Sequence, residues 1–179
     1  MFFNLGLEAD IDRVSDILSE TIEKNQEKIE NIAEELEGKK DIFVLGRGSM
    51  YPLAREIALK LKEISYEHAE GFASGELKHG PLALVTSETP VLAVLTEGSR
   101  PEKTLNNVKE VQARDAPVIA ASSMDEEQFV DTTFEVPSAG IFEPLVANVY
   151  WQLFAYHVSD LKGRPIDKPR NLAKSVTVE

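Results

Sequence analysis

Residues 41–64 read DIFVLGRGSMYPLAREIALKLKEI, and this stretch decides the fold class. Its apolar run at residues 42–45 is typical of a strand that is buried on both faces of a sheet. A loop with two glycines follows at residues 46–49, and Pro52 suits the first turn of a helix that continues to about Ile64. A strand, a glycine loop and an amphipathic helix in this order indicate one unit of a parallel sheet.

The same alternation continues along the rest of the chain. Apolar or β-branched runs predict the further strands, at residues 65–69, 91–95, 118–121 and 132–136. Apolar residues at three- and four-residue steps predict the further helices, at residues 8–37, 101–113 and 142–161. Strands that alternate with helices imply a parallel sheet covered on both faces. We therefore expect an α/β fold, a three-layer αβα sandwich of flavodoxin-like type with about five strands.

The pattern divides the chain into three segments. Residues 1–38 hold a long helix that we expect to pack on the domain, and Gly38 is a candidate for its C-cap. Residues 39–162 hold the alternating strands and helices. Residues 163–179 show no periodic pattern, and we expect them to form an extended tail.

Composition limits the classes of protein that remain. The 179 residues suffice for one domain, and the net charge of −12 argues against nucleic acid or an anionic membrane as partner. The chain has no cysteine, which excludes a disulfide scaffold, a thiolate metal site and a cysteine nucleophile. No apolar run is long enough to span a membrane, and the N-terminus lacks the features of a signal peptide. We expect a cytoplasmic protein.

Chemically active side chains gather in residues 63–84, EISYEHAEGFASGELKHGPLAL. Glu56, Lys60 and Glu63 share one helix face by their spacing, and spacing alone favours a solvated ion-pair stripe. If they serve a site instead, we expect it at the C-terminal edge of the sheet, where open parallel sheets bind ligands. His79 adjoins a Gly-Pro bend, and a surface histidine is as compatible with this position as a proton-transfer group.

The chain ends at residues 167–179 with DKPRNLAKSVTVE. A terminus of this kind is ordinarily frayed, but the apolar residues and two prolines of the tail favour docking on the domain. Together with residues 63–84, this ending resembles the C-terminal part of glucosamine-6-phosphate synthases, the glutamine-dependent fructose-6-phosphate amidotransferases. The resemblance covers nearly the whole chain from Asp41 onward, and it implies the sugar isomerase (SIS) fold.

The resemblance also implies roles for single residues. Glu63 stands where the family has the glutamate that moves a proton between C1 and C2 of the sugar, and Lys60 lines the same site. His79 opens the sugar ring, and in the family this histidine comes from the partner subunit of a dimer. The tail folds over the sugar, so that Ala173 supplies backbone contacts and Lys174 reaches the carbonyl, where a lysine can form a Schiff base.

The whole reaction implied by the resemblance converts fructose 6-phosphate and glutamine-derived ammonia to glucosamine 6-phosphate. It needs neither a metal nor a redox cofactor, and it involves a homodimer, a first SIS domain and a glutaminase domain that this chain lacks. The loop after the strand at residues 91–95 keeps Thr96 and Ser99, but Glu97 and Pro101 depart from a phosphate-binding pattern. In the family, the preceding SIS domain carries the pattern that binds the substrate phosphate.

Two other functions remain compatible with the sequence. The chain could be a non-catalytic module that binds sugar phosphates, although its loops are poor in serine and threonine. It could also be a structural half that dimerises and completes the site of a neighbour. The second alternative gains support if Glu63, His79 and Lys174 do not converge.

Overall fold

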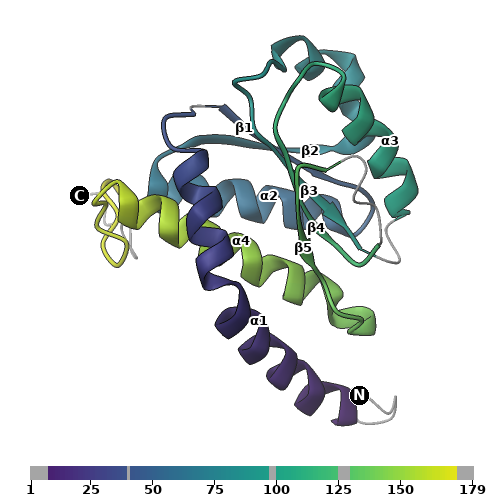
Figure 1. Cartoon of the computed structure of the whole chain (residues 1–179), viewed down its shortest axis with the longest axis vertical. Helices are drawn as coiled ribbons and strands as arrows, with labels where there is room; N and C mark the ends of the chain where they lie inside the picture. Colours follow the sequence, from purple (N-terminus) through teal and green to yellow (C-terminus); the bar gives the residue numbers. More distant parts are fainter. Residues whose placement is uncertain (1–7, 40, 97–99, 125–129, 173–179) are drawn as a thin grey trace, which may run out of the picture.

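The computed structural model describes residues 8–39, 41–96, 100–124 and 130–172. Its centre is a five-stranded parallel sheet in the order β2-β1-β3-β4-β5 (Figure 1). The strands are β1 (Asp41–Gly46), β2 (His68–Ala73), β3 (Val91–Leu95), β4 (Val118–Ser122) and β5 (Thr132–Glu135). The longer helices are α1 (Glu8–Glu35), α2 (Met50–Lys60), α3 (Pro101–Gln112) and α4 (Glu143–Leu161). The predicted parallel α/β sheet is confirmed.

Alternate residues of each strand face opposite layers, as the pleat requires. Ile42 and Val44 of β1 pack in one cluster with α1, α2 and α4, whereas Phe43 and Leu45 pack in a second cluster with α3. Figure 1 accordingly shows α3 on the other side of the sheet from α1, α2 and α4. The expected three-layer sandwich is therefore present, with unequal outer layers.

The helix that begins at Met50 is longer than α2 alone. It continues as a π-helical turn over Leu61–Ser65, where the Ser65 hydroxyl donates a hydrogen bond to the Leu61 carbonyl at 2.6 Å. Tyr66 then ends it with a left-handed backbone, φ 61°. The strand predicted at residues 65–69 is consequently misplaced, because β2 starts only at His68.

The described part of the tail, residues 163–172, also differs from the expectation. It is a series of turns rather than an extended segment. Backbone hydrogen bonds from Arg164 to Ser159 and from Lys168 to Pro165 fold it back beside the end of α4. At the other end of the chain, Gly38 has φ +87°, so it serves as the expected left-handed stop after α1.

Side chains of α1 bond to the backbone of β5 and of the segment after it. The Lys28 amine donates a hydrogen bond to the Thr133 carbonyl of β5 at 2.7 Å, and the Arg13 guanidinium donates one to the Ser138 carbonyl beyond the strand at 3.0 Å. An uncovered edge strand would offer its backbone to other chains, so these contacts protect the sheet. Among the described helices, none combines the length and the apolar character that a bilayer crossing would require.

The turn between β1 and α2 depends on Gly46. A Cβ atom at this position would lie 2.0 Å from the Met50 carbonyl oxygen, so only glycine lets the helix begin this close to the strand. Gly48, two residues later, has open space around it but a positive φ of 56°. The glycine loop thus has a structural reason in the packing of α2 on β1.

We predict that Gly46→Ala lowers the free energy of unfolding by about 3 kcal/mol, because helix and strand must separate. Gly48→Ala is the matched control, and it should cost about 1 kcal/mol for its left-handed backbone. Urea unfolding followed by fluorescence of the buried Trp151 measures both values. Equal losses in the two variants would contradict the close-approach explanation.

Candidate functional site

The direction of α2 decides where Lys60 and Glu63 lie. The helix leaves the C-terminal end of β1 and runs antiparallel to the strand, so its last turn returns to the N-terminal edge of the sheet. The first residues of β1 and β2, Asp41 and His68, meet at that same edge, 2.8 Å apart through their side chains. Our expectation of a site at the C-terminal edge is therefore wrong for this pair.

Lys60 and Glu63 form a close ion pair on the exposed side of this turn. Their amine and carboxylate are 2.6 Å apart, whereas Glu56 approaches the same amine only to 3.6 Å. Both side chains of the close pair are about a third exposed, at 33% and 29%. The hydrogen bond to Glu63 raises the pKa of Lys60, so the lysine is a cation at neutral pH.

A pocket of about 330 Å³ opens beside Glu63. Tyr66, just beyond the π-helical turn, lines one part of it, and the tail residues Arg170, Asn171 and Leu172 line another. The glutamate and the tail come from segments about a hundred positions apart in sequence. The tertiary structure thus brings together the two segments that carried the resemblance.

The tail reaches this pocket through contacts with Tyr66 and Glu67. The guanidinium groups of Arg164 and Arg170 lie over the Tyr66 ring, 5.1 and 4.4 Å from its centre, and the Arg170 backbone N–H donates to the Tyr66 hydroxyl at 2.9 Å. Lys162 forms an ion pair with Glu67 at the same place. Ala173 and Lys174, the other predicted tail residues, lie outside the described residues.

His79 lies at the opposite edge of the sheet. It ends the 3₁₀ helix Ser74–His79, which follows the C-terminal end of β2, and its side chain is exposed. Leu77, fully buried, anchors this short helix to the domain. A strand of six residues spans about 20 Å, so one chain does not bring His79 to the Glu63 pocket.

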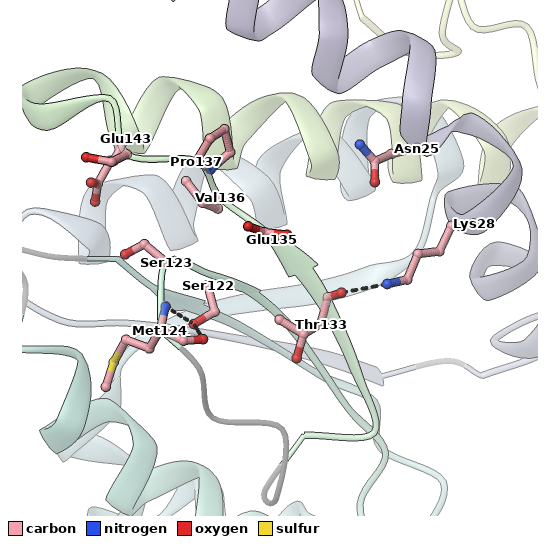
Figure 2. A pocket seen from close by; sticks show the side chains of 11 residues that line it. Asn25, Lys28, Ser122, Ser123, Met124, Thr133, Glu135, Val136, Pro137 and Glu143 are labelled. Carbon is pink, nitrogen blue, oxygen red and sulfur yellow. Dashed lines mark hydrogen bonds between the residues drawn. The ribbon is translucent and has the colours of Figure 1, made fainter.

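Another pocket, of about 560 Å³, lies at the C-terminal ends of β4 and β5 under α1 (Figure 2). Two of its polar side chains, Lys28 and Ser122, make hydrogen bonds within the fold. Lys28 holds the Thr133 carbonyl, and the Ser122 hydroxyl bonds to the backbone of Leu95 and Met124. Lys60, Glu63 and His79, the predicted site residues that the structure describes, do not line it, so its greater volume does not make it the better candidate.

Sequence reasoning missed Tyr66, Glu67 and Lys162. Tyrosine rarely adopts a left-handed backbone, so nothing in the sequence marked residue 66 as the end of the helix. Lys162 stands 95 positions from its partner Glu67, a separation that no local pattern reports. The sequence offered one signal for Tyr66: it follows the predicted site residue Glu63 by only three positions.

Comparisons with known proteins identify the family of the chain. The sequence matches the SIS domain family over residues 35–159. The chain belongs to the SIS domain family. Within that family it is similar to glutamine–fructose-6-phosphate aminotransferases (isomerizing), with 61% identity over 153 residues to the protein from Halobacterium salinarum. This match covers 85% of the chain but only 26% of the relative.

Two further relatives complete the comparison. A protein of the same name from Sphingobium yanoikuyae is 49% identical over 156 residues, 84% of this SIS chain and the whole of that relative. The solved C-terminal domain of glucosamine-fructose-6-phosphate aminotransferase from Francisella tularensis superposes with a TM-score of 0.81 at 36% identity, covering 89% of this chain and 46% of that one. The SIS chain thus spans about a quarter of the Halobacterium protein and resembles the C-terminal SIS half of such enzymes.

We predict that Glu63→Gln lowers the pKa of Lys60, because the charged hydrogen bond that chiefly raises it is lost. Glu56→Gln, which removes the more distant carboxylate, should lower this pKa by less. An NMR titration of the Lys60 side chain measures both changes. If the two variants shift the pKa equally, Glu63 is not the main partner of the lysine.

Proposed function

We propose that this chain is the C-terminal SIS half of the isomerase part of a glutamine–fructose-6-phosphate aminotransferase. The complete enzyme would convert fructose 6-phosphate and glutamine-derived ammonia to glucosamine 6-phosphate. One observation carries the proposal: Glu63 and the docked tail line the same pocket. The named function of the similar proteins supports it. Because the match covers only 26% of the Halobacterium relative, we propose that the chain corresponds to one part of such an enzyme.

Glu63 is the proposed proton carrier. Its carboxylate, paired with Lys60, can accept a proton from one sugar carbon and return it to the neighbouring carbon. The partial exposure of the pair leaves the carboxylate accessible from the pocket. In this proposal Lys60 orients the carboxylate and contacts the substrate.

Lys174 is the proposed handle on the sugar carbonyl, with Ala173 supplying backbone contacts. The tail is docked as far as Leu172 at the Glu63 pocket, and two more residues extend the backbone by at most about 7 Å. A Schiff base requires a neutral amine, and the raised pKa of Lys60 keeps that amine protonated. The resemblance assigns this step to Lys174, and Lys60 is the poorer candidate because its pKa is raised.

His79 is proposed to act in the site of a second chain. Its exposure and its position at the far edge of the sheet leave it available to a neighbour rather than to its own Glu63. A symmetric homodimer would place the histidine of each chain at the site of the other. The substrate phosphate and the ammonia would come from the first SIS domain and the glutaminase domain.

A second candidate function follows from the same separation. Since Glu63 and His79 lie at opposite edges within one chain, the chain could be a structural half that only dimerises and completes a neighbour's site. In that case Glu63 would take no part in chemistry. Removal of the Glu63 carboxylate distinguishes the two functions. It should reduce turnover if Glu63 carries the proton, and it should leave turnover unchanged if the chain is only a structural half.

We predict that a chimaera of the Halobacterium salinarum relative, with this chain in place of its matching segment, makes glucosamine 6-phosphate. Glu63→Gln should then reduce kcat at least about a hundredfold, as expected for the loss of a positioned proton carrier. Glu56→Gln, on the same helix face and in contact with the same lysine, should change kcat less than about threefold. A coupled assay of glucosamine 6-phosphate measures all three proteins.

An inactive chimaera that folds would count against the proposed function. Full activity of the Glu63→Gln variant would favour the structural alternative instead.

We also predict subunit complementation. Glu63→Gln and His79→Asn chimaeras should each be inactive, but a refolded equal mixture should regain about one quarter of the wild-type activity, because half of the dimers would carry one intact site of two. His157→Asn is the control, since this histidine of α4 does not line the Glu63 pocket and should not matter for turnover. No recovery in a mixture that has exchanged subunits would mean that both residues act within one chain.

A further inference from the structure

Tyr66 occupies an unusual backbone position at the end of the first core helix. It directly follows the π-helical turn that carries Glu63, and it adopts a left-handed conformation with φ 61°. This conformation costs a side chain other than glycine or asparagine about 1 kcal/mol or more. An aromatic residue here needs compensating contacts, and those contacts come from the tail.

The Tyr66 ring receives two guanidinium groups from the tail. Arg170 lies 4.4 Å and Arg164 5.1 Å from the ring centre, both within the range of cation–π attraction. The Tyr66 hydroxyl accepts a hydrogen bond from the Arg170 backbone N–H at 2.9 Å. One side chain therefore holds two arginine side chains and one backbone group of the tail.

A second contact fixes the start of the same segment. Lys162, the first residue after α4, forms its ion pair with Glu67, and both groups are largely buried at 19% and 10% exposure. Tyr66 and Glu67 are neighbours, so the tail from residue 162 to residue 170 is fastened at both ends to one dipeptide. That dipeptide stands three and four positions after Glu63.

Few other contacts would hold the tail in place. Leu172 is 56% exposed, so hydrophobic burial contributes little at this point. Asn171 turns the chain with φ 61°, a conformation that asparagine tolerates, immediately after the arginine that Tyr66 holds. The path of the tail up to Leu172 therefore depends on the contacts made by Arg170.

We propose that Tyr66 is a positioning residue that clamps tail residues 162–172 against the helix end that carries Glu63. The purpose of the clamp rests on the proposed function, whereas the clamp itself rests on the contacts alone. The helix end that carries the proposed proton carrier thereby also anchors the tail segment that lines the same pocket.

Hydrogen exchange of the chain, followed by NMR or mass spectrometry, tests the clamp. Tyr66→Asn keeps a residue suited to the left-handed backbone but removes the ring, and it should speed exchange of the tail amides about tenfold or more. Tyr66→Phe keeps the ring and removes only the hydroxyl, so exchange at Arg170 should rise about threefold. Tyr156→Phe, at an exposed tyrosine of α4, is the control and should change nothing.

The strand amides of β1 and β3 serve as an internal reference, because a merely destabilised fold would speed their exchange as well. Tail exchange that stays unchanged in Tyr66→Asn would overturn the clamp. If that variant does not fold, Arg170→Lys decides, since it removes the planar stacking partner from the tail side without touching the helix. Arg170→Lys should speed amide exchange in the tail but not in the strands. Unchanged exchange of the tail amides in this variant would also overturn the proposal.

The positioning role is tested in the active chimaera. Tyr66→Asn should lower kcat about tenfold or more with KM for fructose 6-phosphate nearly unchanged, and Tyr66→Phe should restore most of the rate. A loosened tail with an unchanged kcat would overturn the positioning role. A wild-type chimaera without activity would overturn the proposed function alone, because the exchange measurement judges the clamp independently.

Discussion

The contact of Gly46 with the first turn of α2 sets the path of the chain through the rest of the domain. Because the missing Cβ lets the helix begin directly against the end of β1, α2 returns across the sheet packed along its whole length. A helix that follows a parallel strand must run antiparallel to it, and its last turn therefore lies at the edge where the strands begin. Lys60 and Glu63 occupy that edge for this reason alone. The usual rule that ligands bind outside the strand C-termini does not locate this pair.

This geometry separates Glu63 and His79, the two proposed acid–base groups, which lie only sixteen positions apart in the sequence. Glu63 precedes β2 and His79 follows it, so the strand stands between them. Within one chain they cannot act on one sugar. In the proposed homodimer a second chain would bridge the separation, because the 3₁₀ helix with His79 is exposed whereas Glu63 lies beside its own tail. Division of the proposed site between subunits would then follow from the fold.

The Glu63 pocket also shows why volume is a poor guide to chemistry in this domain. The pocket under α1 is larger, yet its Lys28 bonds to the backbone of β5, and its Ser122 bonds to the backbone of β3 and of the loop after β4. The smaller pocket instead combines a close ion pair, a left-handed tyrosine and a tail held by cation–π contacts. These features cost conformational freedom or strain, and the fold retains them at one place, where two distant segments meet.

The sequence by itself determined the class of fold, since the apolar strand runs, the helical periodicity and the glycine stops are local patterns with local causes. It also placed Lys60 and Glu63 on one helix face, because that follows from helix geometry. Only the tertiary structure decided the edge at which they lie, the π-helical turn and the late start of β2, and the folding of the tail into turns. It alone joined Tyr66 to Arg170 and Glu67 to Lys162, pairs separated by 104 and 95 positions. Contacts over such separations arise from packing of whole elements, and no short pattern in one sequence encodes them.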